Sequence, residues 1–273
     1  MKTTLFALSF AVLATTVYAQ APQPDFSKVE IKTTKVTNSF YTLDGQGGTI
    51  GVLVGPDGIF MVDSQFAPLS QKIAAAIHQI SDKPIRFMVN THVHGDHTGG
   101  NENFAKMGVT IFSRDELRWR LAHPAPGPNN APGVAAPAAA LPVVTYDGPV
   151  TIHMDGEDVH LVPIHRAHTD GDTLVYFPNN DVLMTGDYFP IGMAGPHTKI
   201  IPGHGPTVDR AALIAHRDMI LAIRDKVAAL VQQGKTADEV VAAKPTSDYD
   251  SIPNASTTSE RFVRQLYAEL KTN

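Results

Sequence analysis

The sequence predicts an α/β protein in which two sheets pack face to face and helices lie on the outside. Two observations indicate this class. Short apolar runs bounded by Gly, Pro and Asp occur in both halves of the chain, as is typical of strands. Stretches with apolar residues at helical spacing lie between and after these runs. Because this pattern recurs in two similar halves, two layered sheets are the expected architecture.

In the first half, four strands and three helices are expected. Gly55-Pro56-Asp57-Gly58 is a turn signal that joins two of the strands. Residues 67–80 are expected to form a helix because Leu69, Ile73 and Ile77 share one face. The expected strands are residues 36–41, 51–54, 59–62 and 85–90, and the other helices are residues 100–107 and 115–121.

The stretch from Ala122 to Pro142 is rich in Pro, Ala and Gly and is expected to be a long loop. It is either a surface connector or a flap over a functional site, because long loops in compact domains are often functional. Further strands are expected at residues 143–144, 150–154, 159–164, 173–177 and 182–185.

Three helices are expected after these strands. Thr207 is the expected N-cap of a helix that runs to Gln233 and stops at Gly234. Thr236-x-x-Glu239 and Thr257-x-x-Glu260 match the capping boxes of two further helices. The last helix is expected to dock on the body of the protein through Val263, Leu266, Tyr267 and Leu270.

Residues 1–19 are predicted to be a signal peptide. A positive Lys2, an apolar run from Leu5 to Val17 and a small-residue cleavage site ending at Ala19 are typical of a secretory signal. The apolar run is too short to span a bilayer comfortably. Residues 20–273 are therefore expected to form a single periplasmic or secreted domain with no membrane contact after signal cleavage.

The composition excludes several kinds of site and partner. The chain has no cysteine, so it has no disulfide and no thiolate ligand or nucleophile. The net charge of −5 and the lack of a Lys/Arg cluster argue against a nucleic-acid partner. The expected partner is a small-molecule substrate, and a homodimer is an open alternative.

The segment after the strand at residues 85–90 concentrates metal-binding side chains, in the order His92, His94, Asp96 and His97. Imidazoles and carboxylates are ligands that zinc prefers. His92 and His94 leave an extended chain on the same side. Asp96 and His97 follow Gly95, where the chain can turn towards a second point, so two adjacent metals are indicated. A set of polar loop residues or core histidines is the simpler alternative, but it does not explain four such residues in six positions.

Three later positions repeat this arrangement of one good ligand beside glycine and close to an apolar run. They are His168, Asp187 and His204. With these positions in this order, and with Pro202-Gly203-His204-Gly205 around the last, the chain resembles the metallo-β-lactamase superfamily over nearly all of its mature length. The resemblance implies an αβ/βα sandwich with two zinc ions at one edge. It implies that His92, His94 and His168 hold the first zinc, that Asp96, His97 and His204 hold the second, and that Asp187 bridges them.

The resemblance also implies a hydrolase in which a hydroxide shared by the two metals attacks a carbonyl and Asp96 orients it. A β-lactam or similar cyclic amide is the first expected substrate. A lactone, or a thioester as in glyoxalase II, is the alternative, because Asp187 stands where two β-lactamase groups have cysteine or serine. Lys199 is a weak candidate to bind a substrate carboxylate. A non-catalytic metal-binding scaffold is the alternative from another class.

Other polar residues near these motifs are given smaller roles. His165 and His197 lack the motif context and are not expected ligands. Asp63 either orients a ligand or caps a helix, and a structural role is favoured; Asp172 is ambiguous in the same way. The remaining histidines are expected to be surface or structural residues: His78, His123, His153, His160 and His216.

The segment between Asp187 and His204 is short. Residues 188–198 contain two prolines and two glycines, so they predict a loop and no helix. A parallel crossover normally has a dozen or more residues and a helix. One outer helix is therefore expected to be missing. The consequence is a wider cleft or reduced stability, unless a dimer partner or the C-terminal helix covers the gap.

Overall fold

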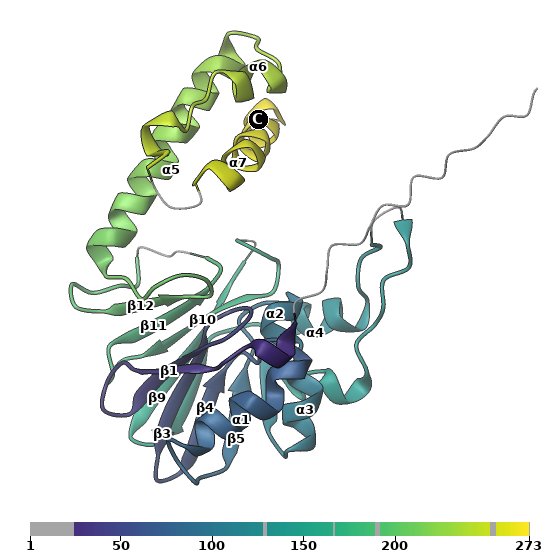
Figure 1. Ribbon diagram of the computed structural model, residues 1–273, viewed down its shortest axis with the longest axis vertical. Helices are drawn as coiled ribbons and strands as arrows, with labels where there is room; N and C mark the ends of the chain where they lie inside the picture. Colours follow the sequence, from purple (N-terminus) through teal and green to yellow (C-terminus); the bar gives the residue numbers. More distant parts are fainter. Residues whose placement is uncertain (1–24, 128–129, 166, 189–191, 252–254, 273) are drawn as a thin grey trace, which may run out of the picture.

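The computed structural model describes residues 25–127, 130–165, 167–188, 192–251 and 255–272 (Figure 1). The predicted signal peptide at residues 1–19 lies outside the described residues. Two mixed sheets pack face to face, so the predicted αβ/βα sandwich is confirmed. No helix among the described residues is long and apolar enough to cross a membrane.

The first sheet has seven strands in chain order, β1 to β7. Its first four strands pair antiparallel, and β4 to β7 pair parallel. All five residues of β4 are buried, as expected for a strand covered on both faces. The strands are β1 Lys32–Lys35, β2 Phe40–Asp44, β3 Ile50–Gly55, β4 Gly58–Val62, β5 Ile85–Val89, β6 Thr110–Arg114 and β7 Val144–Tyr146.

The second sheet has five strands in the order β12-β11-β10-β9-β8. Four of them pair antiparallel, and β12 joins β11 in parallel. The strands are β8 Val150–Met154, β9 Glu157–Ile164, β10 Asp172–Phe177, β11 Val182–Gly186 and β12 Lys199–Pro202.

Two hydrophobic clusters hold these layers together. The cluster between the sheets contains Phe40, Phe60 and Phe177, whose rings meet edge to face. The cluster on the outer face of the first sheet joins it to the helices α1 and α3 through residues such as Ile73 and Phe104. The short helical elements of this half are η1 Phe26–Lys28, η2 Ala67–Leu69, α1 Ser70–His78, α2 Gly95–Thr98, α3 Asn101–Lys106, α4 Asp115–Ala122 and η4 Ala138–Ala140.

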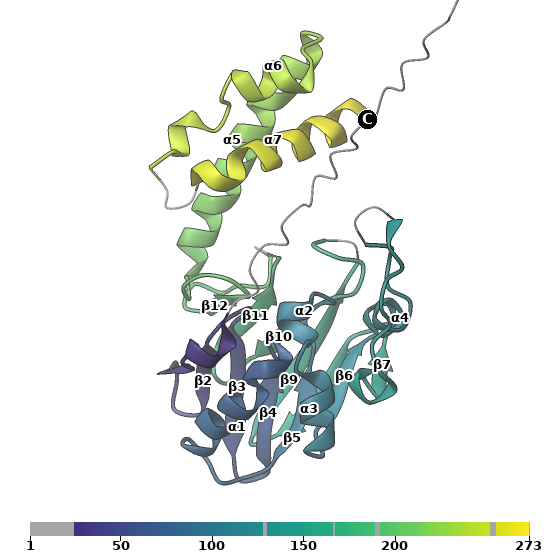
Figure 2. The same ribbon diagram turned by 45° about the vertical axis from the view of Figure 1, so that its right-hand side comes forward.

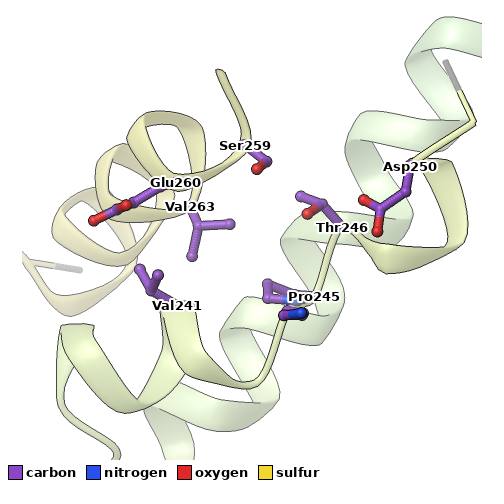
Figure 3. A pocket seen from close by; sticks show the side chains of 8 residues that line it. Val241, Pro245, Thr246, Asp250, Ser259, Glu260 and Val263 are labelled. Atoms are coloured by element: carbon purple, nitrogen blue, oxygen red, sulfur yellow. The ribbon is translucent and has the colours of Figure 1, made fainter. Parts of the chain in front are cut away.

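The last part of the chain is helical and rises beyond the end of the sandwich where α2 lies (Figures 1 and 2). Its helices pack on one another around Ile223, Val227, Val240 and Val263. A cavity of about 280 Å³ opens between α6 and α7 (Figure 3). The elements are α5 Arg210–Gln232, α6 Ala237–Ala242, η5 Ser247–Tyr249 and α7 Ala255–Thr272.

Most predicted elements are present, but four details are wrong. Of the strand expected at residues 36–41, only Phe40 and Tyr41 belong to a strand, β2, and residues 36–39 form the bend that joins β1 to β2. The cap of α5 is Asp209, whose side chain accepts the amide of Ala212, and not Thr207. Thr257 lies within α7, so only the capping box at Thr236 is confirmed. The C-terminal helix docks through the four predicted residues, but in the described part of the chain their hydrophobic cluster is formed with α5 and α6 and includes no residue of the sandwich.

The connection from β11 to β12 has turns and no helix in its described residues, 187, 188 and 192–198. The prediction of a missing outer helix is thus confirmed for the residues that the structure describes. The first turns of α5 partly close this side, because Leu213 packs against Ala194 and Ile200.

Candidate metal centre

The seven predicted ligands lie at one edge of the sandwich because their strands end or begin there. His92, His94, Asp96 and His97 follow β5, and Asp187 and His204 follow the parallel pair β11 and β12. His168 precedes β10, which runs antiparallel to β11. Two backbone hydrogen bonds tie the sheets together at this edge, from Thr173 N to Thr91 O (2.8 Å) and from Thr49 N to Gly203 O (2.7 Å).

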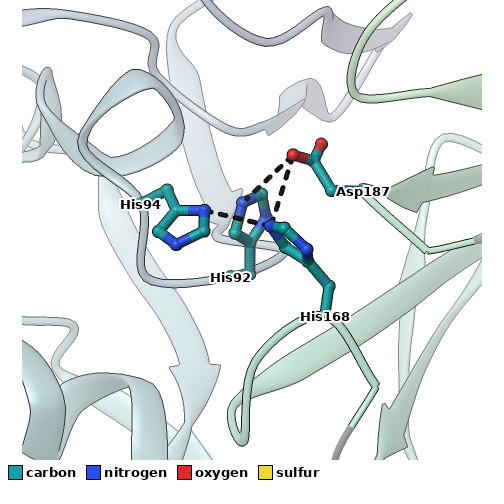
Figure 4. A group of neighbouring side chains, drawn as sticks. All are labelled: His92, His94, His168 and Asp187. Atoms are coloured by element: carbon teal, nitrogen blue, oxygen red, sulfur yellow. Dashed lines mark hydrogen bonds and ion pairs between the residues drawn. The ribbon is translucent and has the colours of Figure 1, made fainter. Parts of the chain in front are cut away.

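The first group of side chains consists of His92, His94, His168 and Asp187, which point towards one another (Figure 4). His168 Nε2 lies 3.0 Å from His94 Nδ1 and 3.4 Å from Asp187 Oδ2. His92 Nε2 lies 3.8 Å from the same carboxylate oxygen.

The second group consists of Asp96, His97 and His204. His204 Nε2 lies 3.1 Å from Asp96 Oδ2 and 3.5 Å from His97 Nε2. His97 Nε2 lies 3.7 Å from Asp96 Oδ2. Asp187 reaches this group too, with Oδ1 3.5 Å from His97 Nε2 and Oδ2 3.6 Å from His204 Nε2. One carboxylate therefore stands between the two groups.

The distances within each group fit a metal ion. Zinc bonds of about 2.0–2.1 Å at tetrahedral angles place the ligand atoms about 3.3 Å apart. The measured separations of 3.0 to 3.8 Å surround this value. In addition, His92 Nε2 and Asp187 Oδ1 are buried and have no hydrogen-bond partner. Buried polar atoms are almost always paired, so these two atoms mark the place where a cation would be bound.

The pKa values of His92 and His94 favour the binding of a cation by the first group. Burial, together with the charge that the neighbouring imidazoles would carry, lowers the pKa of His92 to about 2. Burial and His168 also lower the pKa of His94. Both rings are therefore neutral at neutral pH and keep a lone pair for a metal.

Asp63 orients His97 in the second group. Asp63 Oδ2 lies 2.8 Å from His97 Nδ1, and the same carboxylate accepts the amide and the hydroxyl of Thr91 at 2.7 Å. Burial by itself would lower the pKa of His97, but the charge of Asp63 and the hydrogen bond to it outweigh burial and raise it. Asp63 thus directs Nε2 of His97 towards the cluster, as carboxylates do for metal-binding histidines. Asp63 therefore orients a candidate metal ligand, which goes beyond the purely structural role favoured for it from the sequence.

The loop that bears His168 is held from two sides. Asp172 accepts the amide of Thr169 at 2.8 Å, beside His168. Arg114, which is 1% exposed, donates to the carbonyls of Ile164 (3.0 Å) and Asp170 (2.8 Å) at the two ends of this loop. Asp172 therefore has a definite role in positioning the loop.

Two glycines allow the backbone to approach the cluster closely. A Cβ at Gly48 would lie 2.2 Å from the ring of His97, and one at Gly203 would lie 2.2 Å from Asp187 Oδ1. Gly95, where the chain was expected to turn, has no such close neighbour. It begins α2, and a Cβ there would meet nothing within 4 Å. The turn between the two pairs of ligands is therefore helical and does not require glycine.

The residues given smaller roles lie outside the two groups. His165 contacts Arg114 at 3.4 Å, and His197 is exposed. Lys199 is paired with the start of β11, at the opposite end from Asp187, and its Nζ donates to Val36 O at 2.8 Å. It is not placed to bind a substrate at the cluster. His216 lies on α5 in a cavity that Asp187 also lines.

The comparisons with known proteins identify a family and a fold. The family model of the metallo-beta-lactamase superfamily matches residues 43–233. The stereoselective inverting sec-alkylsulfatase Pisa1 from Pseudomonas sp. has a similar structure, with a TM-score of 0.62 and 18% identity over 88% of this chain and 50% of that one. The DIM-1 metallo-beta-lactamase has a TM-score of 0.53 and 18% identity over 69% of this chain and 96% of that one.

Curated relatives also match in sequence, and two of them are the following. The alpha subunit of 2,4-dinitroanisole O-demethylase from Nocardioides sp. (strain JS1661) is 27% identical over 58% of this chain and 45% of its own length. The linear primary-alkylsulfatase from Pseudomonas sp. (strain ATCC 19151) is 39% identical over 24% of this chain and 14% of its own length. The chain thus spans less than half the length of the curated relatives it matches.

Proposed function

The chain belongs to the metallo-beta-lactamase superfamily, and on this premise we propose that it is a hydrolase that binds two zinc ions. The observation that carries the proposal is the position of Asp187, whose carboxylate lies 3.4 Å from the first group at His168 and 3.5 Å from the second group at His97. One carboxylate between two sets of imidazoles suits a pair of adjacent metal ions.

Bound zinc would lower the pKa of water from about 15.7 towards 7 and would polarise the bond under attack. The side chains of the protein would supply the metal ligands and the group that orients the attacking water. His92, His94 and His168 would hold one ion, and Asp96, His97 and His204 the other. The carboxylate of Asp96, one-quarter exposed beside His204, would accept a hydrogen bond from the attacking water and fix its direction.

The first proposed substrate class is a carbonyl compound, namely a β-lactam or similar cyclic amide, with lactones and thioesters as alternatives. The ligand set supports attack on a carbonyl in general. A β-lactam carboxylate would need a cation near the cluster, and Lys199 is at the opposite end of its strand. The β-lactam is kept as the first candidate, and relative rates on β-lactams, lactones and thioesters decide between them.

The second proposed class is the sulfate esters of alkyl alcohols. Residues 25–209, which precede α5, make up 185 of the 273 residues, or about 68%. The match to the sec-alkylsulfatase covers 88% of the chain and must include part of the C-terminal helices, whereas the match to DIM-1 covers 69%. Because the structural match to the alkylsulfatase extends into the C-terminal helices, a sulfate ester is the second candidate substrate.

A substrate panel tests the proposal. The zinc-loaded protein is assayed with a chromogenic cephalosporin, a lactone, a thioester, an ester and an alkyl sulfate, with zinc per chain measured in parallel. We expect turnover of at least one class and a loss of about 100-fold or more in Asp96→Asn. A protein that holds its zinc and turns over nothing is instead a metal-binding scaffold.

We further propose that the protein is exported, with cleavage after Ala19. This proposal is supported by the charged, apolar and small-residue order of residues 1–19. N-terminal sequencing of the protein recovered from the periplasm tests it, and an intact Met1 would contradict it.

A further inference from the structure

A cavity of about 330 Å³ opens directly beside the metal centre. Asp187 and Tyr188 form one wall, and α5 forms the other. The α5 residues that line it are Leu213, His216, Arg217, Ile220 and Leu221. Its volume lies within the range of about 300–1,000 Å³ that is usual for small-molecule sites.

Counted from Leu213, the lining residues of α5 stand at positions i, i+3, i+4, i+7 and i+8, so they form one continuous face of the helix. The residues that pack against α6 and α7, such as Ile223 and Val227, belong to a separate cluster. The helix therefore has a second apolar face, and Leu221 on it is 37% exposed. Leu213 at the start of this face packs against Ala194 and Ile200, whereas the partly exposed Ile220 and Leu221 border the cavity and are available to a ligand.

The short connection between β11 and β12 makes this face accessible. No helix forms in the described residues of that connection, so α5 faces Asp187 and Tyr188 directly. Among the described residues that line the cavity, the charged groups are Asp187, which belongs to the metal cluster, and Arg217, whose Nη2 pairs with Asp218 at 2.6 Å. The remaining wall is mainly Leu and Ile, which suits an uncharged apolar group.

We infer that this cavity receives the apolar arm, alkyl or aryl, of a substrate whose reacting bond lies at the metal cluster. The inference rests on the proposed hydrolase function. Asp187 connects the two places, because its carboxylate contacts both groups of imidazoles while the residue also lines the cavity. Because the cavity adjoins the metal cluster at Asp187, an apolar arm attached to the reacting group extends from the cluster directly into the cavity.

A series of straight-chain esters and sulfate esters tests this inference on the zinc-loaded full chain. Burial of each additional methylene is expected to raise kcat/KM about threefold to fourfold until the cavity is full. Ile220→Gln and Leu221→Gln are expected to flatten this rise. Ile214→Gln is the matched control, since Ile214 is half-buried on α5 but does not line the cavity. Turnover that does not depend on chain length would overturn the inference.

A binding measurement separates this inference from the proposed function. Saturation-transfer NMR with octan-1-ol, which has no bond to hydrolyse, is expected to show contact with the wild-type protein and with Ile214→Gln. The contact is expected to be lost in the Ile220→Gln/Leu221→Gln double variant, with circular dichroism confirming that it is folded. If octanol binds in this manner but no ester is turned over, the proposed function fails and the cavity assignment holds. If octanol contact is the same in all three proteins, the cavity assignment is wrong.

Discussion

Asp63 Oδ2 lies 2.8 Å from Nδ1 of His97, and both side chains are at most 1% exposed. The two residues are 34 positions apart and meet because β4 and β5 are neighbouring parallel strands. The backbone of Asp63 has a φ of +62°, a conformation that few residues other than glycine, asparagine and aspartate adopt. A buried carboxylate in this conformation serves to hold the ring of His97 towards the second group of ligands.

Asp63→Asn is expected to weaken the second metal site and spare the first. Asparagine tolerates a positive φ, so the backbone is kept while the charge and one accepting oxygen are lost. Loss of such a partner typically lowers metal affinity about 10- to 100-fold. Titration of the zinc-loaded protein with a chelator measures the two affinities. Equal weakening of both sites would show that Asp63 acts on the fold as a whole.

Acidification is expected to remove the second metal before the first. The pKa of His97 is raised by Asp63 despite its burial, so a proton competes with the metal at His97 already at relatively high pH. The pKa values of His92 and His94 are lowered by burial, so protons compete there only at lower pH. Zinc per chain, measured after equilibration between about pH 8 and pH 5, around the ordinary histidine pKa of about 6.5, should fall in two steps.

The Asp63→Asn variant tests whether the second metal is the one lost first. Because Asp63 is the main group that raises the pKa of His97, Asp63→Asn removes the proton competition as well as the orienting bond. The second site in this variant is expected to be weak at every pH and to show a smaller pH dependence. A single step in the wild-type protein, with both ions lost together, would contradict separate control of the two groups.

Gly48→Ala is expected to prevent binding at the second site. The new methyl group would lie 2.2–2.7 Å from ring atoms of His97, which is fully buried and held by Asp63, so the ring has no free space to move into. Overpacking of this kind costs about 1–3 kcal/mol. Thermal unfolding and zinc content are the measurements. Gly95→Ala, directly between the ligands, is the control and should retain both ions because a Cβ there meets nothing.

The ligands were predictable from the sequence because each follows or precedes a strand at the same edge. His92 to His97 form one continuous motif, and His168, Asp187 and His204 lie beside glycines close to apolar strands. Local sequence therefore gives both the identity of these side chains and the end of the sheet where they lie. The distances between the two groups, and the reach of Asp187 to both, depend on how the sheets pack.

Other features depend on contacts that no local pattern reveals. Strand β6 contains the polar Ser113 and Arg114, both buried, so no apolar run marks it in the sequence. Arg114 is buried because its guanidinium bonds to carbonyls near His168 and to Asp147, all distant in the sequence. The role of Asp63 is of the same kind. For the cavity beside α5, the sequence predicts only a wider cleft. Its second wall is formed by α5, and the path of this helix relative to the sheets is set by tertiary packing.

Asp172→Ala is expected to weaken the first metal site and spare the second, the reverse of Asp63→Asn. The buried Asp172 carboxylate accepts the backbone amide of Thr169 and thereby fixes the loop that presents His168. Without it the amide is unsatisfied and the loop gains freedom, so the affinity of the first site should fall about tenfold or more. Asp172→Asn keeps an accepting oxygen and should restore most of this affinity. Asp158→Ala, at an exposed ion pair with His153 on the same sheet, is the control and should bind both ions normally. If Asp172→Ala and Asp158→Ala bind the first ion equally well, His168 is positioned by Arg114 and the strand ends alone.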